Sequence, residues 1–165
     1  MATVKAKLWL PTGEWLITDL ERSYYLLPNF QIWEIANTSA KDEIKLVVDE
    51  RAWILLKMMQ ITRDRFGRMA INSVYRTKSF NDSLPNADKN SCHLNCWAFD
   101  WEIKNQSNAE RQIVADWWKN LCREFGQIGA INYYSNGYHC EIGSDIQYGY
   151  TEFKIRDHRG KKGDW

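Results

Sequence analysis

Residues 91–100 read Ser-Cys-His-Leu-Asn-Cys-Trp-Ala-Phe-Asp, and this stretch places a histidine and a carboxylate at the start of an apolar strand. From Trp97 onward the aromatic side chains alternate with other residues, so that they point to one face and Asp100 to the other. Burial of the aromatic face therefore presents Asp100 on the opposite face. His93 arrives from the loop just before the strand.

A second stretch, residues 137–143, reads Gly-Tyr-His-Cys-Glu-Ile-Gly. As a strand it turns its apolar residues to one face and His139 and Glu141 to the other. If the two strands lie side by side, His93, Asp100 and His139 meet at one point. Two imidazoles, one carboxylate and an open fourth position form the ligand set of a catalytic zinc ion. The two stretches together predict such a site.

Length and composition limit the alternatives. The 165 residues are enough for one domain with a sizeable core. The 22 basic and 21 acidic residues leave a formal net charge of +1, so we expect no binding to nucleic acid. No apolar run reaches the roughly 18 residues of a membrane-spanning helix, and we expect none. The 9 Trp, 8 Tyr and 6 Phe indicate either an aromatic core or a groove that faces carbohydrate or peptide.

The first residues, Met-Ala-Thr-Val-Lys-Ala-Lys-Leu-Trp-Leu-Pro, are too polar for a secretory signal. We therefore expect a protein that is cytoplasmic as synthesised, in which the four cysteines stay reduced. Three of them, Cys92, Cys96 and Cys140, lie in the two motif stretches, which leaves a thiolate zinc site open as an alternative. Small buried residues are the expected role of Cys96 and Cys140.

Helices and hairpin-connected strands are mixed without a regular alternation, which predicts an α+β domain with a central, mostly antiparallel sheet flanked by helices. Asp49 is the expected N-cap of a helix that ends at Phe66, with Gly67 after it. Ser107 and Glu110 have the spacing of a capping box for a second helix ending near Phe125. Its expected buried stripe is Ile113, Trp117, Leu121 and Phe125.

Strands are expected around a turn at residues 11–13, where the hairpin forms either an edge of the main sheet or a binding surface. One or two helical turns are expected in residues 29–36. A strand over residues 69–76 would deliver Arg76, and residues 77–84 would form a short helix or loop. The last expected strands are residues 130–134, 138–143 and 147–155. They are followed by a basic surface tail, residues 156–165, in which His158 is expected to be solvated.

The order of these motifs resembles the LAS peptidases, the zinc D-Ala-D-Ala carboxypeptidases and L-alanyl-D-glutamate endopeptidases, with relatives among phage endolysins. The pattern Ser-x-His-x-x-Gly-x-Ala-x-Asp corresponds to Ser91, His93, Cys96, Ala98 and Asp100. Residues 73–76 match an upstream Ser-Gly-Tyr-Arg segment, and residues 133–141 match a downstream Tyr-Tyr-Pro…Phe-Val-His-Val-Asp segment. The resemblance covers residues 28–165, including the final Trp165, and leaves residues 1–27 as an N-terminal strand or hairpin extension.

The resemblance implies the LAS-type (hedgehog-like) zinc peptidase fold, with Zn²⁺ held by His93, Asp100 and His139. Arg76 would steady the carbonyl or the developing oxyanion, and Ser91 would hold the substrate or support the site. The reaction would be hydrolysis of a D-amino-acid-containing bond in the peptidoglycan stem peptide, by a carboxypeptidase or an endopeptidase. We expect a monomer that acts on the cell wall, for example as an endolysin after release by a holin.

The sequence departs from the family pattern at two positions. Cys96 stands where the pattern has glycine, and Asn136 stands where members such as the dipeptidases carry a Glu or Asp three residues before the last zinc histidine. An amide cannot accept a proton, so Glu141 is either the substitute catalytic base or a residue that supports His139. The alternative function is a non-catalytic peptidoglycan-binding or phage structural module that retains the fold.

Overall fold

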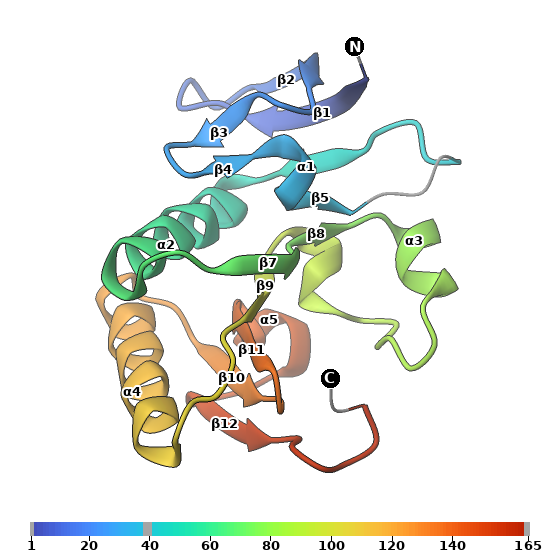
Figure 1. Ribbon diagram of the computed structural model, residues 1–165. Coiled ribbons are helices and arrows are strands. Elements are labelled where there is room, and N and C mark those ends of the chain that lie inside the picture. The colour runs from blue at the N-terminus through green and yellow to red at the C-terminus, as the bar shows by residue number, and fades with distance from the viewer. Residues whose placement is uncertain (1, 38–40, 164–165) are drawn as a thin grey trace.

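A five-stranded sheet lies at the centre of the computed structural model, which describes residues 2–37 and 41–163 (Figure 1). Its order is β12-β10-β11-β9-β7. All neighbouring strands are antiparallel except β12, which runs parallel to β10. The strands are β7 (Ala70–Ser73), β9 (Ala98–Glu102), β10 (Gly129–Tyr133), β11 (Gly137–Ile142) and β12 (Lys154–Asp157). The predicted α+β class with a mostly antiparallel sheet is confirmed.

The N-terminal hairpin forms a sheet of its own, at the top of Figure 1. Strands β1 (Thr3–Trp9) and β2 (Trp15–Glu21) pair in antiparallel fashion, and β1 pairs in parallel with β6 (Leu46–Val48). The hairpin is therefore not an edge of the main sheet. Every second residue of β1 is buried in the core that holds the rest of the chain. The proposed boundary at residue 27 stays a prediction, although β1 shares its core with later segments.

The two long helices begin and end where the sequence predicts. Helix α2 (Glu50–Phe66) is capped by the Asp49 carboxylate, which accepts a hydrogen bond from the Ala52 amide at 2.7 Å. Gly67 follows it with a φ of 82°, which glycine adopts without strain. Helix α4 (Asn108–Glu124) begins with the capping box that Ser107 and Glu110 were predicted to form.

The predicted buried stripe of α4 is confirmed at Leu121, which is 4% exposed, but it is wrong by one position nearer the start of the helix. Ile113 is 55% exposed and Trp117 is half-buried, whereas Val114 and Trp118 are buried. The buried Arg111 in the first turn explains the rotation. Its guanidinium donates to the carbonyl oxygens of Tyr134 and Ser135 at 2.9 and 3.0 Å, so this side of the helix must face the sheet.

The predicted strand over residues 69–76 is two strands in the structure, β7 and β8 (Tyr75–Arg76), with a break at Val74. After β7 the chain leaves β9 and pairs in parallel with β5 (Ala36–Asn37). The backbone carbonyl at Val74 is therefore not used in a sheet, and it becomes a hydrogen-bond acceptor for His93.

The predicted strand over residues 147–155 is confirmed only at its last two residues, Lys154 and Ile155. The chain forms a short helix, α5 (Ser144–Tyr148), and only then strand β12. Gly143 and Gly149, both with a φ of 69°, bracket this helix in the left-handed conformation. Arg156 consequently belongs to a sheet strand and not to a surface tail, while Trp165 lies outside the described residues.

The remaining elements connect these parts. They are β3 (Tyr25–Leu27), β4 (Phe30–Gln31), α1 (Ile32–Ile35), α3 (Lys78–Ser83) and the 3₁₀ helix η1 (Cys92–Asn95). Helix α1 is the expected helical turn of residues 29–36, and α3 confirms the short helix expected after Arg76. None of the helices in the described ranges is long and apolar enough to cross a membrane.

Candidate metal centre

The site is built on one row of residues that crosses the five-stranded sheet. Ser73 pairs with Asp100, Asp100 with His139, His139 with Asn132, and Asn132 with Arg156. Residues that pair across neighbouring strands have their side chains on the same face of the sheet. The register alone therefore brings Asp100 and His139 together, as the alternation in the two sequence stretches predicts.

His93 reaches this row from η1, the turn before β9. Ser91 caps the turn by accepting a hydrogen bond from the His93 amide at 3.3 Å. Cys96 ends it in the left-handed conformation with a φ of 59°. The position where the family pattern has glycine thus does adopt a positive φ, here with a buried cysteine.

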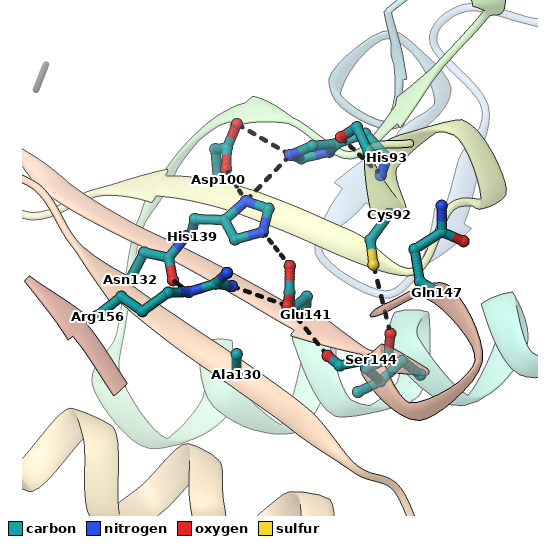
Figure 2. A network of polar contacts seen from close by, with 12 residues as sticks. Cys92, His93, Asp100, Ala130, Asn132, His139, Glu141, Ser144, Gln147 and Arg156 are labelled. Carbon is teal, nitrogen blue, oxygen red and sulfur yellow. Dashed lines mark hydrogen bonds and ion pairs between the residues drawn. The ribbon is translucent and has the colours of Figure 1, made fainter. Parts of the chain in front are cut away.

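Three potential ligand atoms converge, all within 4.8 Å of one another: Nε2 of His93, a carboxylate oxygen of Asp100 and Nδ1 of His139 (Figure 2). His139 Nδ1 lies 2.7 Å from Asp100 Oδ1, and His93 Nε2 lies 3.2 Å from both Asp100 Oδ2 and His139 Nδ1. Within the described ranges these residues are the one group with this arrangement, and it contains no cysteine.

The outer nitrogen of each imidazole has a partner that fixes the ring. His93 Nδ1 lies 2.6 Å from the carbonyl oxygen of Val74, and His139 Nε2 lies 2.8 Å from Oε2 of Glu141. Each partner accepts a hydrogen bond, so the proton of the neutral ring is placed on the outer nitrogen. The lone pairs of His93 Nε2 and His139 Nδ1 then point to the common centre, as in zinc sites.

Glu141 is itself held by a second group of residues. Its Oε1 accepts hydrogen bonds from Ser144 Oγ and Arg156 Nη2, both at 3.0 Å (Figure 2). Arg156 is anchored in turn by Asn132 Oδ1 at 2.7 Å. The Glu141 side chain is 1% exposed. It contacts His139 at Nε2, the ring nitrogen that faces away from the ligand centre.

The electrostatics follow from this arrangement. Burial disfavours the charged form of His139, but the hydrogen bonds with Asp100 and Glu141 outweigh it and raise its pKa to about 9. Burial lowers the pKa of His93. Burial also opposes ionisation of Asp100, but the two histidines hold its pKa well below the usual range. Without a metal ion, the positive charge of protonated His139 thus balances the negative charges of Asp100 and Glu141. A bound cation would take over this role.

Arg76 approaches the same carboxylate from β8. Its Nη2 donates to Asp100 Oδ2 at 2.8 Å, and its Nε donates to Ser73 Oγ at 2.8 Å. The arginine therefore orients Asp100 and places positive charge beside the centre. It also lines the cleft described next.

The centre opens into a cleft of about 580 Å³. The sequence-predicted residues Arg76, Ser91, His93, Asp100, His139 and Glu141 all line it. One part of its wall is the segment between α3 and η1, residues 84–88, and another comes from β10 and the C-terminal segment. The residues from the latter part include Asn132, Tyr134, Arg156 and His158.

The donor set fits zinc. Two imidazole nitrogens and one carboxylate oxygen, each supported by an outer hydrogen bond, leave an open side toward the cleft. A thiolate site receives no support, because Cys140 is buried on the opposite face of β11 and burial raises the pKa of the Cys92 and Cys96 thiols. Asn136 is exposed.

Sequence reasoning missed several residues of the site. The sequence places Arg156 and His158 in a solvated tail, and it predicts no role for Val74 or Ser144. The basic composition of residues 156–165 favours a solvated tail and does not indicate that Arg156 belongs to the site. The two-residue spacing between Arg156 and His158, however, is typical of two side chains on one face of a strand. Nothing in the sequence indicates the Val74 carbonyl, because its role depends on the break between two strands.

Comparison with known proteins agrees with this geometry. Residues 28–140, more than half of the chain, match the family described as Peptidase M15. No curated protein and no solved structure matches the chain. The matched segment contains Arg76, His93, Asp100 and His139, and it ends just before Glu141.

Proposed function

The chain belongs to the peptidase M15 family of zinc-dependent metallopeptidases, and from this premise we propose that it hydrolyses a D-amino-acid-containing bond in the peptidoglycan stem peptide. The observation that carries the proposal is the convergence of His93 Nε2, Asp100 and His139 Nδ1 at the base of an open cleft. When bound there, zinc supplies Lewis-acid chemistry and lowers the pKa of water to about 7.

The residues around the centre orient the metal ligands and bind the substrate. Arg76 donates one hydrogen bond to Asp100 and one to Ser73, and its other N–H groups are available to bind the carbonyl oxygen of the scissile bond. Ser91 fixes the turn that carries His93. Membership of the peptidase M15 family supports a peptide substrate in general. The choice of the peptidoglycan stem peptide as that substrate is supported only by the resemblance of the sequence motifs to the LAS peptidases.

We assign Glu141 the task of orienting His139 rather than that of the catalytic base. Its carboxylate contacts His139 Nε2, while the candidate ligand atom is Nδ1 on the other side of the ring. Ser144 and Arg156 occupy the other carboxylate oxygen. A carboxylate that is almost fully buried and has both oxygens hydrogen-bonded is poorly placed to exchange a proton with a substrate in the cleft.

The experiment is digestion of purified peptidoglycan by the zinc-loaded protein, followed by mass spectrometry of the released fragments. We expect new amino and carboxyl ends in the stem peptides, and the position of the cut distinguishes a carboxypeptidase from an endopeptidase. His93→Ala and chelator-treated protein serve as the inactive controls. Intact stem peptides after digestion by fully zinc-loaded protein would contradict the proposal.

A non-catalytic peptidoglycan-binding module is the second candidate, and the amide Asn136 at the expected acid position favours it. This module would bind stem peptides and leave them intact in the same experiment. The phage setting, cytoplasmic synthesis and release by a holin stay predictions from the sequence.

A further inference from the structure

Strand β12 ends at Asp157, and the next residue, His158, lines the cleft of the metal centre. The His158 amide donates to the carbonyl oxygen of Tyr133 at 2.9 Å, which holds the residue after β12 against the end of β10. Arg156 lies within β12, and His158 follows two residues later, just after the end of the strand. Both line the cleft together with His93, Asp100 and His139.

The imidazole of His158 is held by stacking. Its ring lies on the Tyr134 ring with 5.2 Å between centroids and 14° between planes. Tyr134 is the residue directly after β10, and it also lines the cleft. Neither ring nitrogen of His158 forms a hydrogen bond within the part of the chain that the structure describes. The stack therefore fixes the ring and leaves both nitrogens able to bond with a substrate.

The other titratable groups in the cleft are poorer proton acceptors. Glu141 is buried, and both of its carboxylate oxygens accept hydrogen bonds from neighbouring side chains. Burial raises the pKa of Tyr134 and of Tyr148, so both phenols remain protonated near neutral pH. Asp88 is an exposed carboxylate of the wall segment, and its Oδ1 accepts a hydrogen bond from the Asn90 amide at 2.8 Å. His158 and Asp88 are therefore the two groups to compare.

The surroundings of His158 favour its neutral form. Burial lowers its pKa, and the positive charges of Arg156, Lys161 and His139 lower it further, while Asp157 acts in the opposite direction. Asp157 forms an ion pair with Arg159 at 2.6 Å, which reduces its influence. A neutral imidazole with a free nitrogen can accept a proton at neutral pH.

We propose that His158 is the proton-transfer residue of peptide hydrolysis in this cleft. Its imidazole accepts a proton from the attacking water as the bond between oxygen and the carbonyl carbon forms. The imidazolium then donates that proton to the amide nitrogen as the carbon–nitrogen bond breaks. The proposal rests on the proposed peptidase function, and it assigns the role left open by Asn136 to a residue beyond the segment that matches the family.

The test compares His158→Ala with Asp88→Asn, the rival group, and with Ile155→Ala, which removes an exposed side chain from the other face of β12. All three variants are first analysed for zinc content, which we expect to equal that of the wild type. For His158→Ala we expect kcat on stem-peptide cleavage to fall by about 10²–10⁴-fold with little change in KM. Added imidazole should restore part of the lost rate.

Two further measurements separate proton transfer from a structural role. The rate of the wild type should fall at acidic pH with the pKa of His158 measured by NMR, and this acidic limb should be absent in His158→Ala. Wild-type kcat in His158→Ala, loss of zinc from it, or loss of activity in Asp88→Asn alone would overturn the proposal. If the wild-type protein cleaves no stem peptide, the proposed function itself fails.

Discussion

His139 and Asp100 lie directly opposite each other on β11 and β9, with 2.7 Å between Nδ1 and Oδ1. This relationship is set by the register of two central strands and not by a flexible loop. A slip of one strand against the other by one residue would place His139 and Asp100 on opposite faces of the sheet. Two of the three potential metal ligands are therefore positioned by the fold itself, and only His93 depends on a turn.

His93→Ala is expected to abolish stoichiometric zinc binding and to leave a folded protein, because one of three ligands is lost while the five-stranded sheet and its core remain. Elemental analysis after dialysis measures the metal, and far-ultraviolet circular dichroism measures the fold. His158→Ala is the matched control, since it removes a histidine from the same cleft that we do not assign to the metal. Equal zinc content in wild type and His93→Ala would show that the ligand set is wrong.

Glu141→Gln is expected to weaken zinc binding by about 10–100-fold. The change keeps the size of the side chain but removes the negative charge that supports His139 and pairs with Arg156. Competition with a chromophoric chelator gives the affinity. If Glu141 is instead the catalytic base, zinc affinity will stay unchanged and only kcat will fall.

The chelator-treated protein is expected to lose stability between about pH 6.5 and pH 9. The pKa of His139 is raised to about 9 in the folded protein, so its contribution is complete below about pH 6.5 and disappears as the pH rises through 9. This shift in the pKa of His139 corresponds to about 3 kcal/mol in the free energy of unfolding. Thermal unfolding across this range measures it, with His139→Gln as the control. A midpoint that is independent of pH in the wild type would refute the assignment.

Leu8→Ala is expected to destabilise the whole protein by about 2–5 kcal/mol, because Leu8 lies 7% exposed in the core shared by β1 and later segments. Ile17→Ala on β2 is the control, since this side chain is 59% exposed and its loss should cost less than about 0.5 kcal/mol. Chemical denaturation gives both values. A small effect of Leu8→Ala would indicate that residues 1–27 are an independent extension.

Much of the site could be predicted because it depends on short-range patterns. Alternation in residues 97–103 and 137–143 identifies the faces of β9 and β11, and therefore the meeting of Asp100 and His139. The helix caps at Asp49 and Ser107 are likewise local, since each is satisfied within three residues. Such features require no knowledge of the tertiary structure.

The parts that could not be predicted depend on contacts between distant segments. The rotation of α4 is fixed by Arg111, whose acceptors lie on the hairpin between β10 and β11. The break at Val74 follows from pairing of β8 with β5, about forty residues earlier in the chain. Arg156 and His158 join the site only because β12 pairs in parallel with β10, a connection that their sequence does not reveal.

The central claim is that His93, Asp100 and His139 hold the zinc ion, and X-ray absorption at the zinc edge tests it most directly. The account predicts one zinc per chain with only nitrogen and oxygen neighbours at about 2.0–2.2 Å. His93→Ala should remove this signal. A sulfur neighbour at about 2.3 Å, or a protein that retains no zinc, would contradict the account.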